Sequence, residues 1–141
     1  MFVVDASVWV ARYRPNDLNH RESRAWLESV FALGQKVIGP TLLLPEVAGP
    51  ISRASGEMLA RRVLSELTGL FGVRLLSLGH DLSLHSARSA ARLRLRGADA
   101  VYVALAASFG MPLVTWDGEQ QERAARAIDV RTPSELLAGA P

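Results

Sequence analysis

Two kinds of apolar pattern alternate along the chain. Short runs of apolar, β-prone residues are separated by longer segments in which apolar residues recur every three or four positions. The short runs predict buried strands, and the longer segments predict amphipathic helices. Strands are predicted at 2–4, 36–38, 73–76 and 112–115, with a last edge strand at 129–131. Helices are predicted at 7–14, 20–33, 41–55, 57–71, 80–96, 98–109 and 118–127.

Two of the predicted helices have an unusual composition. The helix 41–55 contains Pro45, which a first turn tolerates, and Pro50, which should kink the helix or end it early. The helix 98–109 is apolar nearly all round, which is typical of a buried element.

The alternation of strands and helices predicts the fold class. Parallel strands are joined by helical crossovers, so this order implies a mainly parallel central sheet of four to five strands with helices on both faces. We therefore expect an α/β protein, a three-layer α/β/α sandwich. The 141 residues fit one domain, 1–141, and 49% apolar with 21% charged residues is an ordinary balance for a globular protein.

The sequence lacks the features of a membrane or secreted protein. No apolar run approaches the roughly 20 residues that a membrane helix needs. The first residues include no basic stretch of the kind that opens a secretory signal, and Asp5 interrupts their apolar run. The chain contains no cysteine, so it forms neither disulfides nor thiolate metal sites. These observations lead us to expect a cytoplasmic protein.

Four acidic residues fall where a parallel sheet forms its binding sites, at the carboxyl ends of strands. Asp5 and Asp117 come just past the first and fourth predicted strands, while Asp99 and Glu46 come early in neighbouring helices. Each also has a structural interpretation: a helix cap for Asp5, a helix-start charge for Asp99, a solvated position for Glu46 and a turn for Asp117. That interpretation does not explain why all four occupy such positions together. We therefore predict a shared site.

Acidic side chains that share a pocket need a cation. Two like charges about 4 Å apart repel by roughly 4 kcal/mol at an effective dielectric constant of about 20. The repulsion raises the pKa of the carboxyl groups and destabilises the fold. Mg²⁺ and Mn²⁺ take oxygen ligands, and such an ion activates water and stabilises charge on a phosphodiester. The spacing leaves open whether one ion or two bind.

Four short motifs, in their order and spacing, resemble the PIN-domain family, and within it the VapC-type toxins of prokaryotic toxin–antitoxin pairs. The likeness covers almost the whole chain. The motifs are Val4-Asp5-Ala6-Ser7, Pro45-Glu46-Val47, the segment 97–106 around Asp99, and Thr115-Trp116-Asp117. Two positions depart from the family pattern: Pro50, one turn beyond Glu46, and Gln120, where an apolar residue is usual.

The resemblance implies a function and the parts that perform it. It implies metal-dependent cleavage of RNA, with Mg²⁺ or Mn²⁺ held by Asp5, Glu46, Asp99 and Asp117. It gives supporting roles to the hydroxyl groups of Ser7 and Thr115. It also implies a small antitoxin as partner, whose tail blocks the acidic pocket, and a homodimer.

The predicted helix 80–96 carries a basic stripe beside its apolar face. Arg88, Arg92 and Arg96 recur every four residues and end just before Asp99. Either they contact RNA phosphates, with Arg92 and Arg96 the candidates, or they form a solvated helix edge. The apolar face comprises Leu84, Ala87, Ala91 and Leu95, and Gly97 ends the helix.

Two residues in or beside the motifs, Trp116 and Glu119, have two possible roles each. Trp116 either stacks on a base or points into the core. Glu119 is either an auxiliary acid or a solvated helix residue. Tyr102 is predicted to be a core residue.

Other functions fit the sequence less well. A phosphorelay receiver needs paired acids after its first strand and a lysine after a late strand, but Lys36, beside the second strand, is the only lysine. A phosphatase with an aspartate nucleophile favours Asp-x-Asp after the first strand, where position 7 is Ser7. Two alternatives remain open: an RNA-processing nuclease of this fold outside a toxin–antitoxin pair, and a module of this fold that binds RNA or a partner without cutting.

Overall fold

The computed structural model describes residues 1–139 and contains a parallel sheet. Its strands are β1 (Phe2–Val4), β2 (Val37–Pro40), β3 (Val73–Leu76), β4 (Leu113–Val114) and β5 (Val130–Arg131). They lie in the order β3-β2-β1-β4-β5, and every neighbouring pair is parallel. Val3 of the central strand is in register with Ile38 on one side and Leu113 on the other. The predicted parallel sheet is confirmed, and the segment predicted as a last edge strand is indeed β5 at the edge.

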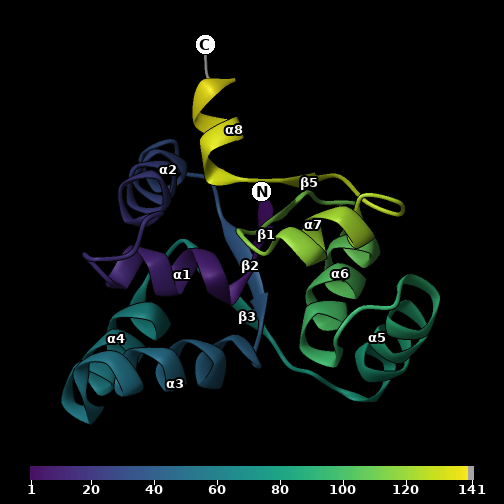
Figure 1. Cartoon of the computed structure of the whole chain (residues 1–141), viewed down its shortest axis with the longest axis horizontal. Coiled ribbons are helices and arrows are strands. Elements are labelled where there is room, and N and C mark those ends of the chain that lie inside the picture. The colour runs from purple at the N-terminus through teal and green to yellow at the C-terminus, as the bar shows by residue number, and fades with distance from the viewer. Residues whose placement is uncertain (140–141) are drawn as a thin grey trace.

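Helices cover both faces of this sheet. They are α1 (Ala6–Tyr13), α2 (His20–Ala32), α3 (Leu43–Ser55), α4 (Glu57–Gly69), α5 (His80–Leu93), α6 (Gly97–Phe109), α7 (Gly118–Ala124) and α8 (Pro133–Ala138). After β1, the chain adds β2 and then β3 on one side of β1. It then crosses to the other side of β1 and adds β4 and β5. Because crossovers are right-handed, this reversal places later helices on the opposite face. Figure 1 shows α1 to α4 on one side and α5 with α6 on the other, which confirms the three-layer α/β/α sandwich.

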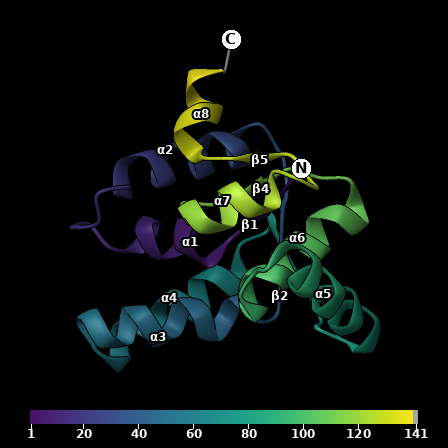
Figure 2. The same cartoon turned by 45° about the vertical axis from the view of Figure 1, so that its right-hand side comes forward.

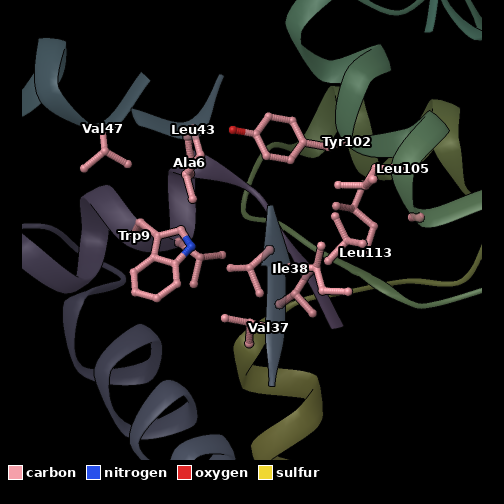
Figure 3. Packing of buried hydrophobic residues seen from close by; sticks show 14 of the residues in the cluster. Ala6, Trp9, Val37, Ile38, Leu43, Val47, Tyr102, Leu105 and Leu113 are labelled. Atoms are coloured by element: carbon pink, nitrogen blue, oxygen red, sulfur yellow. The ribbon is translucent and has the colours of Figure 1, made fainter. Parts of the chain in front are cut away.

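The core forms where these layers meet. Val3 and Val4 of the central strand are fully buried. Trp9 and Val47 lie on one side of β2, and Tyr102 lies on the other (Figure 3). Residues 100–106 of α6 are buried without a break, and α6 contacts β1, β2 and β4. The prediction of a buried helix is therefore confirmed.

Helix α5 differs from its prediction in length and in orientation. It ends at Leu93, because Arg94 takes a left-handed conformation with φ 55°, and does not continue to residue 96. Leu84 of the predicted apolar face is 44% exposed, and Ala87 and Ala91 are exposed as well. The buried face consists of Ser86, Ser89 and Leu93.

A small polar side chain explains the different face. The Ser86 hydroxyl donates a hydrogen bond of 2.6 Å to the backbone carbonyl of Leu82, within the same helix. Because the hydroxyl group already has a hydrogen-bond partner within its own helix, burial of this serine costs little more free energy than burial of an alanine. Its small volume suits the close packing of α5 against α6.

Helix α3 contradicts one of the outcomes predicted for Pro50. Instead of ending early, α3 continues to Ser55. Val47 and Ile51 on either side of the proline are both fully buried, and α3 packs against α1 and α4. This packing holds the helix together despite the backbone hydrogen bond that a proline cannot donate.

The sequence prediction missed the short helix α8. Thr132 caps it, and Thr132 with Glu135 forms a reciprocal capping box, with Pro133 in the first turn. This Thr-Pro-x-Glu pattern is a recognisable helix start. The helix lies beside α2 (Figures 1 and 2). No helix among residues 1–139 combines the length and the apolar character needed to cross a membrane.

Candidate functional site

The site lies where the strand order reverses. β1 and β4 are neighbours, but the chain leaves them in opposite directions across the sheet. Open α/β sheets form a crevice at such a point, beyond the carboxyl ends of the strands. Asp5 follows β1 directly and is the N-cap of α1, while Asp117 follows β4 and is the N-cap of α7. Two of the predicted acids therefore stand at this crevice.

Asp5 is the most buried of the four acids. The residue is only 7% exposed. Its Oδ2 accepts hydrogen bonds from the backbone N–H of Ser7 at 2.9 Å and from the Thr115 hydroxyl at 3.3 Å. Burial raises the pKa of Asp5, and the hydrogen bonds from Ser7 and Thr115 lower it only in part. Asp5 is thus a helix cap, as the structural interpretation held, and also a carboxylate that forms no ion pair with a basic side chain among residues 1–139.

Two hydroxyl groups join the segments that carry Asp5 and Asp117. The Ser7 and Thr115 hydroxyls lie 3.3 Å apart. Ser7 Oγ accepts from the backbone N–H of Trp116 at 3.0 Å, and Thr115 Oγ1 accepts from the backbone N–H of Asp117 at 3.0 Å. These bonds fix the loop after β4 against the start of α1 and so set the separation of the two carboxylates.

Gln120, one of the departures from the family pattern, has a place in the same framework. Asp117 Oδ1 accepts from the Gln120 backbone N–H at 2.8 Å. The Gln120 side chain is fully buried and donates through Nε2 to the backbone carbonyl of Asp99 at 3.2 Å. Gln120 therefore ties the first turn of α7 to the first turn of α6, a role that an apolar residue does not perform.

Asp99 and Glu46 complete the acidic set from two further helices. Asp99 lies in the first turn of α6, where burial, followed by the charges of Asp117 and Asp5, raises its pKa to about 6. Glu46 lies in the first turn of α3, and burial is again the main cause of its raised pKa, with Asp5 and Asp99 adding to it. The charges of the four groups therefore act on one another.

Tyr102 was predicted as a core residue only, but it also contacts one of the four acids. It is fully buried, as predicted, but its hydroxyl donates a hydrogen bond of 2.6 Å to Glu46 Oε2. Tyr102 lies one helical turn after Asp99 on α6. The spacing of three residues was the available signal, because it puts both side chains on one face of the helix.

All four acids line one pocket, with a volume of about 530 Å³. Carboxylate oxygens are the donors that hard divalent cations prefer. Within residues 1–139, no three histidine or acidic side chains lie close enough together to hold a metal ion directly. Mg²⁺ typically binds through one or two carboxylates and keeps several waters. The donor set, the raised pKa values and the room in the pocket therefore fit a hydrated divalent cation.

The basic stripe predicted beside the site is interrupted. Arg96 lies beyond the end of α5, as the residue that precedes α6, so it is not in line with Arg92. Its guanidinium pairs with Glu119 at 3.0 Å, and Glu119 pairs in addition with Arg123 at 2.9 Å. Glu119 is thus engaged by two arginines outside the pocket. The RNA contacts of Arg92 and Arg96 stay predictions.

Trp116 lies in the wall of the pocket and packs against the core from there. Its side chain lines the cavity and is half-buried. The indole N–H donates to the hydroxyl of the buried Ser23 on α2 at 2.7 Å. This bond fixes the ring in the wall of the pocket.

The comparison with known proteins identifies the family. A family model of the PIN domain matches residues 2–127. The chain belongs to the PIN-domain family. No curated protein matches the sequence significantly.

Solved structures share the fold of this PIN domain. VapC20 from Mycobacterium tuberculosis, described as a sarcin-ricin loop cleaving toxin, is 21% identical, with a TM-score of 0.75 over 93% of this chain and 99% of that one. A toxin–antitoxin complex from Klebsiella pneumoniae is 17% identical, with a TM-score of 0.68 over 94% and 98%. VapBC2 from Rickettsia felis, bound to a promoter DNA fragment, is 11% identical, with a TM-score of 0.72 over 93% and 97%. At these identities the likeness concerns the fold.

Proposed function

We propose that this PIN domain is a metal-dependent endoribonuclease and the toxin of a toxin–antitoxin pair. One observation carries the proposal: Asp5, Glu46, Asp99 and Asp117, which lie in or directly before four different helices, line a single pocket at the reversal point of the sheet. A purely structural role does not account for this arrangement: burial raises the pKa of Asp5, Glu46 and Asp99, neighbouring carboxylates raise the pKa of Glu46 and Asp99 further, and both effects oppose folding.

The residues of the pocket divide the work of catalysis. Asp5, Glu46, Asp99 and Asp117 would hold a hydrated cation, with one or two carboxylates bound to it directly and the others through its waters. Ser7 and Thr115 keep Asp5 and Asp117 in place through their hydroxyl groups. When bound, Mg²⁺ or Mn²⁺ supplies an activated water and stabilises charge on the phosphodiester. Tyr102 orients Glu46 by its hydrogen bond, as groups behind metal ligands commonly do.

The toxin part of the proposal draws on the structural neighbours. Several of them are toxins or toxin–antitoxin complexes. By analogy, a small antitoxin blocks the acidic pocket of this chain, RNA is the substrate, and two copies form a dimer in the cytoplasm. A neighbouring gene that encodes a small DNA-binding protein would support this pairing. Its absence favours the alternative of an RNA-processing nuclease outside a pair.

A cleavage assay tests the enzymatic proposal. The purified protein is incubated with single-stranded RNA and, separately, single-stranded DNA, in Mg²⁺, in Mn²⁺ and in a chelator. We expect cleavage of RNA only when a divalent cation is present. Residues that merely orient metal ligands contribute about 10- to 100-fold, so loss of a ligand in Asp99→Asn should reduce the rate by about 100-fold or more.

The matched control is Asp129→Asn. Asp129 is exposed beside β5, pairs with Arg131 and does not line the pocket. Its variant should cleave like the wild type. Full activity of Asp99→Asn would show that Asp99 has no role in catalysis. A wild-type protein that binds RNA but cleaves none with either cation would favour the non-catalytic binding module.

A further inference from the structure

The pocket is larger and more acidic than a cation alone requires. It extends from the four acids to the loop between α1 and α2, and the charged groups that line it are five carboxylates and one guanidinium. The guanidinium belongs to Arg53, and Asp17 supplies the fifth carboxylate. An RNA strand brings further negative charge into this space. A bound cation screens the phosphate beside it, but a neighbouring phosphate needs a different positive group.

Arg53 reaches the pocket along one face of α3. Glu46, Gly49, Pro50 and Arg53 all line the pocket, and their spacing of three, four and seven residues places them on the same side of the helix. Long side chains on a helix point back toward its N-terminus. The guanidinium of Arg53 is thereby directed toward the turn that carries Glu46.

Gly49 makes room for this conformation. A Cβ atom at position 49 would lie 3.2 Å from Nη1 of Arg53, closer than an ordinary van der Waals contact. Apart from proline, glycine is the residue that destabilises a helix interior most, by about 1 kcal/mol relative to alanine. Its presence here lets the guanidinium lie against the helix backbone at the edge of the pocket.

The guanidinium has no acidic partner. Among residues 1–139, no carboxylate oxygen lies within 4.0 Å of Arg53. Arg96, by contrast, is already paired with Glu119. A guanidinium offers several N–H donors in a planar fork that matches phosphate oxygens, and an unpaired one is available for such a contact.

We propose that Arg53 binds an RNA phosphate adjacent to the scissile one and so positions the strand in the acidic pocket. This inference rests on the proposed ribonuclease function. Two residues on one face of α3 then have different roles: Glu46 in the first turn binds the cation, and Arg53, seven residues later, binds the RNA. The alternative role of Arg53 is structural, as a cation near the C-terminus of α3 that interacts with the helix dipole.

Binding measured without catalysis tests the inference. Fluorescence anisotropy of a labelled single-stranded RNA is recorded in a chelator at several salt concentrations. A charge-assisted hydrogen bond corresponds to about 10-fold or more in affinity, so Arg53→Ala should raise Kd by about 10-fold. The slope of log Kd against log salt should fall by about 0.7, the value for one phosphate contact on a single strand. Arg53→Lys should recover part of the affinity.

The matched control is Arg62→Ala. Arg62 is exposed on α4, does not line the pocket, and its replacement changes the net charge by the same amount. It should leave both Kd and the salt slope at wild-type values. Gly49→Ala should weaken RNA binding less than Arg53→Ala does, and without lowering the melting temperature.

The outcomes separate this inference from the proposed function. If wild-type protein cleaves RNA and Arg53→Ala matches Arg62→Ala in Kd and slope, the role of Arg53 is overturned while the nuclease stands. If Arg53→Ala lowers affinity and slope in a protein that never cleaves, the phosphate contact stands and the nuclease falls. A lower melting temperature with unchanged RNA binding would assign Arg53 the structural role.

Discussion

Some surface carboxylates among residues 1–139 have a lowered pKa, whereas acids of the pocket have a raised one. Glu135, whose side chain accepts the backbone N–H of Thr132 in the capping box of α8, has a lowered pKa. Glu28, paired with Arg24 on α2, has one as well. Asp99 has a pKa raised to about 6, with burial as the largest cause. Structural carboxylates are paired and stabilise the fold, whereas an unpaired acid in the pocket opposes folding until a cation arrives.

Replacement of Asp99 by asparagine tests this difference through the pH dependence of stability. The folded-state pKa of about 6 exceeds the unfolded value near 3.9, so the folded state binds more protons between these pH values. The wild-type free energy of unfolding therefore decreases as the pH rises from about 4 through 6, and the penalty is constant above. Because Asp99 is partly exposed, we discount the full shift to a penalty on the order of 1 kcal/mol.

Urea unfolding in a chelator at pH 4.5, 5.5, 6.5 and 7.5 measures this penalty. The difference in unfolding free energy between Asp99→Asn and wild type should grow with pH and level off above about pH 7. Asp129→Asn, at an exposed position, provides the comparison. A difference that stays flat across the series would show that Asp99 carries no raised pKa in the folded state.

At the scale of elements, α3 combines a stability cost with its place in the pocket. Pro50 lies inside this helix and cannot donate the backbone hydrogen bond that the carbonyl of Glu46 would accept. Pro50 also lines the pocket beside Glu46. The helix therefore owes its continuity to packing rather than to local sequence preference.

Pro50→Ala should stabilise the protein. A proline in a helix interior is about 3 kcal/mol less favourable than alanine, and loss of its rigidity in the unfolded chain offsets up to about 1 kcal/mol. We expect a net gain of about 2 kcal/mol in urea unfolding, with RNA cleavage retained. Pro45→Ala is the matched control, because the first turn of α3 requires no N–H donor there. A gain of equal size in both variants would contradict the explanation.

The elements also show which parts of the fold a sequence specifies. β1 and α6 were predictable because they are apolar almost throughout, and their burial can be predicted without knowledge of their neighbours. The face of α5 was not predictable from hydrophobicity, because the polar Ser86 is buried and self-satisfied while Leu84 remains exposed. Hydrophobic periodicity records the preference of each side chain and not the volume that a neighbouring helix leaves for it.

The same distinction applies to the pocket. Asp5 and Asp117 could be placed from the sheet rule alone, since parallel strands carry their sites at one edge. The contacts of Tyr102 with Glu46, and of Trp116 with Ser23, join side chains 56 and 93 residues apart. No local pattern encodes such pairs. They depend on helix packing distances, which only the folded structure provides.

At the scale of the whole molecule, folding gathers the charges of the pocket. The four acids belong to α1, α3, α6 and α7 or precede them directly, so both helical layers must be docked on the sheet before the carboxylates approach one another. The unfolded chain keeps them apart and solvated. A cation that binds the pocket therefore binds the folded state alone, and it stabilises the entire sandwich rather than one loop.

Thermal melts measure this coupling directly. At a concentration 100 times its Kd, Mg²⁺ or Mn²⁺ should stabilise the wild type by about 2.7 kcal/mol, which raises Tm by about 10 °C for a chain of this size. The gain should shrink as the pH falls through about 6, because protons on Asp99 compete with the cation. Asp99→Asn should lose most of the gain, whereas Arg53→Ala should keep it, since Arg53 is proposed to bind RNA. NaCl at matched ionic strength separates site binding from general screening. An equal rise of Tm in NaCl would mean that the carboxylates hold no specific ion, and the proposed catalytic chemistry would then have no cation to act through.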